Sequence, residues 1–203
     1  MRKLSLLLSL ACAAGAALAA PPQRVGIDYE LRRNGSAVAE VHERLVHDGR
    51  TYRLSQTWKA KGLYAIRGEA RRSSAGRVGP EGLRPEAFED LRPGKDPRRA
   101  APAAGMQDRL SVLWHFAFRP PTARVTLQVA DGRGLSAHVY EPAGRERIRT
   151  PAGDFHALKL ERSDEGRRAQ VWLAPERGNV PVRVLVTEKD GTVLEVTAVR
   201  ITQ

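Results

Sequence analysis

Cysteine, aromatic residues and long apolar runs are all scarce in this sequence. Its 203 residues include one cysteine, Cys12, and aromatic side chains make up 5% of the chain. A single cysteine cannot form an internal disulfide, and it cannot supply a cysteine-rich zinc site. Stability must therefore come from a packed hydrophobic core, and a chain of this length is large enough to bury one.

Runs of like charge are missing as well, although the formal net charge is +11. The arginines occur singly or in pairs with acidic residues nearby, which is typical of a solvated surface. Without a basic stripe or an aromatic stacking motif, we expect no nucleic-acid partner. The positive charge is compatible with contact to an anionic membrane surface or a cell-wall polymer.

The one long apolar run lies at the N-terminus, from Leu4 to Leu18, after a positively charged start. Ala17-Leu18-Ala19 has the small-x-small pattern that signal peptidase cleaves, so we predict that residues 1–19 are removed between Ala19 and Ala20. The run is too short for a transmembrane helix, and we expect a periplasmic protein with no transmembrane span.

A second interpretation of the N-terminus makes Cys12 the lipid-modified first residue of a lipoprotein. That motif favours leucine three residues before the cysteine, where this chain has Ser9. We therefore keep lipoprotein export as the minor alternative.

Strand-like alternation dominates the rest of the chain. Residues 52–60 are the clearest case, because Tyr52, Leu54, Gln56 and Trp58 share one face. Turn residues such as Asn34-Gly35 separate the alternating runs. The other strands are predicted at 25–31, 37–46, 63–72, 83–88 (a short edge strand), 123–130, 135–141, 144–149, 155–162, 167–174, 181–188 and 192–202, with a turn at 73–76.

One short helix is predicted, with Asp108 as its N-cap and Pro120-Pro121 as its end. A single helix cannot cover both faces of a parallel sheet. We therefore predict a mainly β fold: one antiparallel, strongly curled sheet or open barrel of about ten strands. Residues 20–203 should form one domain, monomeric, with a flexible loop at about 92–105.

Motifs for catalysis, metals and cofactors are absent from the sequence. It has no G-x-S-x-G motif, its five histidines lack zinc-ligand spacing, and Pro80 removes an N–H donor from the glycine-rich stretch 76–82. The stretch 170–184, where prolines and charged residues crowd beside a tryptophan, is explained as two strands and a turn. We predict no catalytic residues, no metal site and no cofactor.

The three tryptophans, Trp58, Trp114 and Trp172, are the most informative side chains that remain. The simplest interpretation places all of them in the core. The alternative is that some line a pocket inside the curled sheet. For such a pocket we predict Trp58 and Trp172 in the wall, with Gln107 and Asp108 as its polar rim.

Several phrases, taken together and in order, resemble one family. They are "GIDYELRRNG" (26–35), "GLRPEAF" (82–88), "QDRLSVL" (107–113), "TPAGDFHALKLER" (150–162), "WLAPERGNVPVRV" (172–184) and "EKDGTVLEV" (188–196). The chain is similar over about residues 25–201 to the bacterial exported family called domain of unknown function 3108. The resemblance implies an exported, mostly antiparallel β protein of Gram-negative envelopes, and it implies no activity.

Our leading functional hypothesis is a non-enzymatic periplasmic protein that binds an apolar or amphipathic, lipid-like envelope component or serves envelope assembly. The alternative is an envelope hydrolase or carbohydrate-active enzyme whose site is assembled from scattered Asp, Glu and His residues. A third interpretation is a scaffold that pairs an exposed sheet edge with a strand of another protein.

Overall fold

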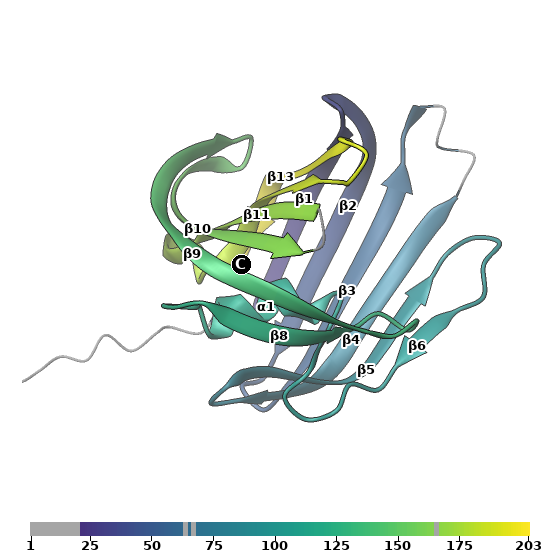
Figure 1. Ribbon diagram of the computed structural model, residues 1–203, viewed down its shortest axis with the longest axis vertical. Coiled ribbons are helices and arrows are strands. Elements are labelled where there is room, and N and C mark those ends of the chain that lie inside the picture. Colours follow the sequence, from purple (N-terminus) through teal and green to yellow (C-terminus); the bar gives the residue numbers. More distant parts are fainter. Residues whose placement is uncertain (1–20, 63–64, 66–67, 165–166) are drawn as a thin grey trace, which may run out of the picture.

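Thirteen strands and one α-helix make up the described part of the protein, shown in Figure 1. The computed structural model describes residues 21–62, 65, 68–164 and 167–203. The predicted signal peptide, Cys12 and the start of the strand predicted at 63–72 lie outside these residues. The strands are β1 (Arg24–Arg33), β2 (Ser36–His47), β3 (Thr51–Ala60), β4 (Glu69–Gly79), β5 (Gly82–Leu91), β6 (Arg98–Ala100), β7 (Gln107–Asp108), β8 (Val125–Ala130), β9 (Leu135–Thr150), β10 (Gly153–Asp164), β11 (Arg167–Ala174), β12 (Val180–Thr187) and β13 (Val193–Thr202).

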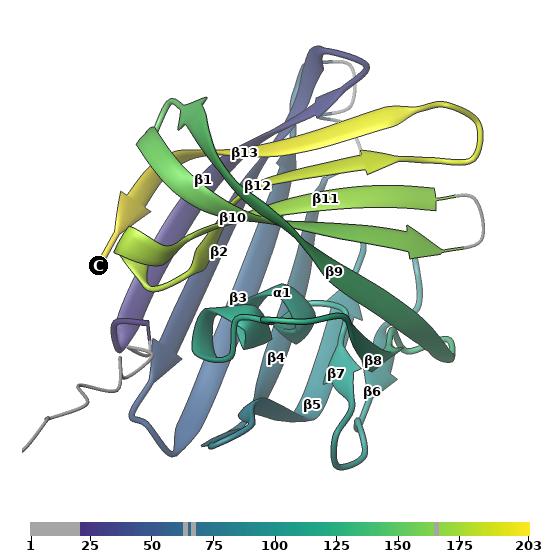
Figure 2. The ribbon, with the colours of Figure 1, turned by 60° about the vertical axis from the view of Figure 1, so that its left-hand side comes forward.

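All strands belong to one sheet with the order β6-β5-β4-β3-β2-β1-β13-β12-β11-β10-β9-β8-β7. Neighbours are antiparallel except β7 and β8, which are parallel. The sheet curls until β7, at one edge, also contacts β5 near the other edge (Figures 1 and 2). The fold is therefore a nearly closed, barrel-like sheet, which confirms the predicted mainly β class.

The helix α1 (Ser111–Phe118) lies on the concave side of this sheet and packs against β5, β7 and β12 (Figure 2). Its Trp114 and Phe116 are each 1% exposed and are among the largest fully buried side chains. The helix therefore fills part of the space enclosed by the sheet. Within the described part of the chain, no helix is long and apolar enough to cross a membrane.

The predicted start of the helix needs a correction. The helix begins at Ser111, and Asp108 belongs to β7. The Asp108 carboxylate still accepts hydrogen bonds from the backbone N–H groups of Leu110 (2.8 Å) and Ser111 (2.7 Å). Asp108 thus satisfies donors of the first turn from two residues before the N-cap position.

Alternation in the sequence correctly identified the inward-facing residues of the first strands. In β1, Val25, Ile27, Tyr29 and Leu31 are buried while the residues between them are not. The Tyr29 hydroxyl donates a hydrogen bond of 2.8 Å to the backbone carbonyl of Pro181 on β12. This bond satisfies the buried hydroxyl and joins two strands that are far apart in the sequence.

The turn predicted at 73–76 and the short edge strand predicted at 83–88 are both wrong. Residues 73–76 lie inside β4, and β5 is ten residues long with β4 and β6 on either side. The pairing shifts register where Gly76 faces Pro85. A β-bulge there accommodates a proline inside the sheet, so both residues mark an irregularity and not an end.

Two further boundaries differ from the prediction. Residues 135–141 and 144–149 form one continuous strand, β9, because a register shift beside Pro142 and a positive φ at Gly144 keep the pairing with β10. The segment 92–105, predicted as a flexible loop, contains the short strand β6, which pairs with β5.

Replacing Gly76 by alanine should lower the free energy of unfolding by about 1–3 kcal/mol. A Cβ at this position would overlap the carbonyl oxygen of Arg84 and lie 2.8 Å from the amide nitrogen of Glu86. Urea denaturation measures the change. Gly79→Ala in the same strand is the matched control, since the nearest atom to its Cβ is Arg84 Cδ at 3.5 Å. Equal effects of the two substitutions would contradict the close approach at the bulge.

Candidate functional site

An interior cavity of about 400 Å³ lies between α1 and the concave face of the sheet. Its wall is largely apolar because the inward-facing positions of several strands carry branched aliphatic side chains. The apolar lining residues include Leu31, Val41, Val112, Leu113, Val129, Val171, Val184, Val186, Leu194 and Val196. Ligand pockets of proteins commonly have volumes of roughly 300–1,000 Å³ and are lined mainly by such side chains.

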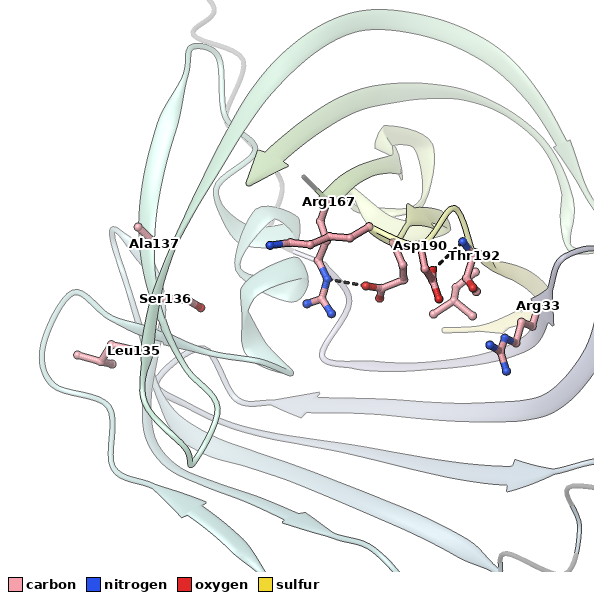
Figure 3. Close-up of a pocket in the computed structure, with 10 residues that line it drawn as sticks. Arg33, Leu135, Ser136, Ala137, Arg167, Asp190 and Thr192 are labelled. Carbon is pink, nitrogen blue, oxygen red and sulfur yellow. Dashed lines mark hydrogen bonds and ion pairs between the residues drawn. The ribbon is translucent and has the colours of Figure 1, made fainter. Parts of the chain in front are cut away.

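A hollow of about 1060 Å³, here called the mouth, lies at the end of the sheet where the β1–β2 and β12–β13 turns meet the start of β9. Figure 3 shows Leu135, Ser136 and Ala137 on one side of it, and Arg167, Asp190, Thr192 and Arg33 on the other. The mouth and the cavity share four lining residues: Ser136, Arg167, Glu188 and Leu194. The mouth is therefore the entrance to the cavity.

A hydrogen-bonded chain of polar side chains crosses the cavity wall from β3 to the helix. The Trp58 indole N–H donates to the Gln56 carbonyl oxygen, and the Gln56 amide donates to Glu43. Glu43 also accepts a hydrogen bond of 2.7 Å from the indole N–H of Trp114 on α1. This chain fixes the ring of Trp58 against the cavity and ties α1 to β2.

Glu43 is a carboxylate in an unfavourable environment. Burial raises its pKa above the ordinary value of 4.5, and the hydrogen bonds from Trp114 and Gln56 offset part of that rise. The positive charge of Arg72, on β4, also lowers the pKa of Glu43. Since the net shift is upward, the folded protein holds the proton of Glu43 more tightly than the unfolded chain does.

The substitution Glu43→Gln tests this shift through the pH dependence of stability. A raised folded-state pKa means that Glu43 contributes most stability below pH 4.5 and loses that contribution as the pH rises through the folded-state pKa. The free energy of unfolding of the wild type, relative to Glu43→Gln, should therefore fall between pH 4.5 and neutral pH. Urea titrations at several pH values measure this difference. A difference that rises with pH would show that the pKa of Glu43 is lowered.

Arginines give the cavity a positive side. It is lined by four arginines (Arg72, Arg109, Arg162, Arg167) and three carboxylates (Glu43, Asp131, Glu188). Arg72 lies 3.3 Å from Asp90, donates to the Gln56 carbonyl oxygen at 3.0 Å and stacks on Trp58, with its guanidinium carbon 5.1 Å from a ring centroid. Burial, followed by the charge of Arg109, lowers the pKa of Arg72 to about 10. The pKa of Arg109 is also lowered, by burial first and then by the charge of Arg92.

The structure places the four predicted ligand-binding residues in three different settings. Trp58 lines the cavity and is partly buried. Trp172 follows the cavity-lining Val171 on β11 and therefore points to the opposite face of that strand. Gln107 and Asp108 are buried beside α1, at 3% and 0% exposed, and do not form a rim.

Trp172 is a core residue on the outer side of β11, only 3% exposed. The guanidinium of Arg183 lies 4.8 Å and the ammonium of Lys159 5.7 Å from its ring, and its indole N–H donates to Glu146. These cations pack on a ring that also belongs to the main hydrophobic cluster. For Trp114 and Trp172 the simplest interpretation, core packing, is the one the structure shows.

The side chains of Gln107 and Asp108 form hydrogen bonds with other groups of the protein. The Gln107 amide donates to the Leu83 carbonyl oxygen (2.8 Å), and its side-chain oxygen accepts from the Ser111 hydroxyl (2.9 Å). The Asp108 carboxylate accepts from the Ser74 hydroxyl in addition to the two helix amides. Both residues fix the approach of the chain to α1, which explains their burial without a ligand.

The three carboxylates that line the cavity each bind a different set of protein groups. Glu188 binds Arg167 at 2.5 Å, Asp131 accepts backbone N–H groups from Arg133 and Gly134, and Glu43 binds the two indole and amide donors described above. Over the described residues, no group of three His, Cys, Asp or Glu side chains could hold a metal ion. Each of these three carboxylates thus has its own hydrogen-bond or ion-pair partners in the protein.

The sequence of this chain matches the model of one protein family. The sequence profile described as "Protein of unknown function (DUF3108)" matches residues 88–199, more than half of the chain. The protein belongs to the DUF3108 family. The match spans the end of β5, all of β6 to β12 with α1, and most of β13, so it includes every residue that lines the mouth except Arg33 on β1. Comparison with curated proteins gives no match.

Several solved structures are similar to this DUF3108 protein at low sequence identity. A β-barrel-like protein of the DUF1849 family from Brucella abortus matches with a TM-score of 0.53 and 9% identity, covering 89% of this chain and 97% of the other. A candidate lipoprotein from Parabacteroides distasonis matches with a TM-score of 0.46 and 10% identity, covering 91% and 98%. A candidate exported protein with a YmcC-like fold from Bacteroides fragilis matches with a TM-score of 0.44 and 11% identity, covering 91% and 98%. The Brucella structure supports the barrel-like architecture and no more.

Arg72 and Arg109 are the cavity residues that the sequence did not single out. Arg72 lies at a position of β4 whose side chain points inward, and the alternation of inward and outward positions along the strand was its only sequence signal. Arg109 lies between β7 and α1, where no periodic pattern applies. Neither residue could be distinguished in the sequence from the many other arginines of this basic chain.

Proposed function

We propose that this DUF3108 protein is a non-enzymatic binding protein that holds one amphipathic, lipid-like molecule inside its curled sheet. The single observation that carries the proposal is the interior cavity, whose apolar wall opens into a polar mouth. An acyl chain would lie against the valine and leucine side chains, and a polar group would face the charged side chains that line the same cavity. Burial of the chain would supply about 25 cal/mol for each Å² of apolar surface removed from water.

The construction of the cavity supports binding over catalysis. Its apolar lining comes from strands of a continuous sheet, and its one long hydrogen-bonded chain, from Trp58 to Trp114, fixes side chains in place. The carboxylates near it are bound to separate partners, and a hydrolase would need at least one placed to transfer a proton to the substrate.

We also propose that the protein works in the periplasm after export. The apolar N-terminal stretch with its Ala17-Leu18-Ala19 cleavage pattern supports this location. An amphipathic envelope component would be the natural ligand there. Fractionation of the native bacterium, with mass spectrometry of the mature N-terminus, tests the location: a chain that retains residues 1–19 in the cytoplasm would contradict it.

Native mass spectrometry of the protein purified from its own periplasm tests the binding proposal. We expect one lipid-like mass per chain, lost on delipidation, and a change in tryptophan fluorescence when palmitate is added back, because Trp58 lines the cavity. The substitution Trp58→Phe should reduce that fluorescence change while leaving binding measurable by mass spectrometry, and the change that remains should come from Trp114, which also lines the cavity. Trp172→Phe is the control, since Trp172 lies on the other face of β11 and should not report binding. A protein that carries no lipid-like mass and binds neither fatty acids nor lipid A fragments would overturn the proposal.

A further inference from the structure

We propose that the ligand carries an acidic head group and that Arg109 binds it. This inference rests on the proposed function and names the chemical class of the molecule that the cavity holds. The carrying observation is that Arg109 lines the cavity and keeps an accessible side chain there. Among the described residues, its guanidinium takes part in no hydrogen bond or ion pair.

Two carboxylates, Asp90 and Asp131, interact electrostatically with Arg109, but both bind other groups. Asp90 binds Arg92 at 2.5 Å and lies 3.3 Å from Arg72. Asp131 directs one carboxylate oxygen to the backbone N–H groups of Arg133 (2.8 Å) and Gly134 (3.2 Å), which fixes it in the β8–β9 turn. Arg109 therefore lies near the positive charges of Arg92 and Arg167, and its guanidinium has no hydrogen-bonded or ion-paired partner among the described residues.

The other three cavity arginines each have a direct partner, and Arg162 lies 3.0 Å from the Nδ1 atom of His138. Arg72 is held by Asp90, Gln56 and the ring of Trp58, and Arg167 is held by Glu188 at 2.5 Å. Burial and the positive charge of Arg109 lower the pKa of the Arg72 guanidinium, while burial and the positive charge of Arg92 lower the pKa of the Arg109 guanidinium. An anion placed at Arg109 would relieve the repulsion among these positive charges and gain charge-assisted hydrogen bonds from a five-donor side chain.

The position of Arg109 suits a molecule with one apolar and one acidic end. The residue directly precedes Leu110, and Val112 and Leu113 of the following helix line the same cavity. A chain lying along these side chains toward Val184 and Val196 would leave its head group within the reach of Arg109. A carboxylate and a phosphate monoester both have the required charge and geometry.

Binding of three probes with the same alkyl chain tests the inference: palmitate, hexadecyl phosphate and hexadecanol. We expect the delipidated full-length mature protein to bind both anions about tenfold or more tightly than the neutral alcohol. Arg109→Gln should remove most of that preference and change the affinity for hexadecanol by less than about twofold. Arg109→Lys should retain part of the preference because it keeps the charge. The tighter of the two anions in the wild type identifies the acid.

Arg133→Gln is the matched control, because it removes an exposed arginine of the β8–β9 turn that does not line the cavity. It should leave all three affinities unchanged, and circular dichroism should show that each variant folds. Equal binding of anions and alcohol by the wild type, or an equal loss in Arg109→Gln and Arg133→Gln, would overturn the role of Arg109 and leave the binding proposal standing. Failure of all three probes to bind would overturn both.

Discussion

Replacing Trp114 by alanine should lower the free energy of unfolding by about 3–5 kcal/mol, the range typical of buried tryptophan truncations. Trp114 is 1% exposed and packs within the main hydrophobic cluster. The substitution leaves a large void under α1 and removes the 2.7 Å hydrogen bond to Glu43. A carboxylate whose pKa is already raised by burial would then lose one of its two donors. Chemical denaturation monitored by circular dichroism measures the change.

Trp58→Ala is the matched control for this stability prediction. Trp58 is the same residue type, belongs to the same hydrogen-bonded chain and lines the same cavity, but it is only partly buried. We expect its truncation to cost clearly less than that of Trp114, because fewer packing contacts are lost. A larger loss of stability for Trp58→Ala than for Trp114→Ala would contradict the role of α1 as the interior support of the barrel.

Replacing Ala169 by phenylalanine should weaken the binding of palmitate by about tenfold or more. Ala169 is a small residue on the inner face of β11, 5% exposed, and it lines the cavity. A phenyl ring would occupy space that the acyl chain needs, and forcing extra volume into such a site costs about 1–3 kcal/mol. Isothermal titration with the delipidated protein measures the loss.

The adjacent residue supplies the control. Gln170 lies one position along β11 and faces outward, where its amide donates to Glu161 at 3.2 Å. Gln170→Phe adds a ring of the same size on the other face of the strand, so palmitate affinity should not change. If both substitutions weaken binding equally, the ligand does not lie inside the sheet and the cavity is not the binding site.

Much of the fold could be predicted because a strand that is buried on one face leaves a period of two in the sequence. Val25 to Leu31 and Tyr52 to Trp58 show this pattern clearly, and the structure places them as expected. The wrong strand ends at 73–76, 83–88 and 141–144 occurred where a glycine or a proline lies inside a strand. Gly76 and Pro85 face each other at a bulge that depends on the pairing of two strands, and the local sequence alone does not contain that pairing.

The site was less predictable than the fold. Inward parity correctly placed Trp58 on the concave face, and the same rule, applied from Val171, places Trp172 outside. The prediction for Trp172 was based on its residue type and did not use the register of β11. Gln107 and Asp108 were predicted as the polar rim of a pocket, and only the tertiary structure shows that Ser74, Leu83 and the helix amides use their hydrogen bonds.

A crystal structure of the delipidated protein with palmitate tests the central claim most directly. The claim is that the interior of the curled sheet holds the apolar part of a ligand. We predict the alkyl chain between α1 and the inner face of β12 and β13, in contact with Val184 and Val196, with the carboxylate at Arg109. Palmitate bound on the outer face of the sheet, with the interior cavity empty, would contradict the account.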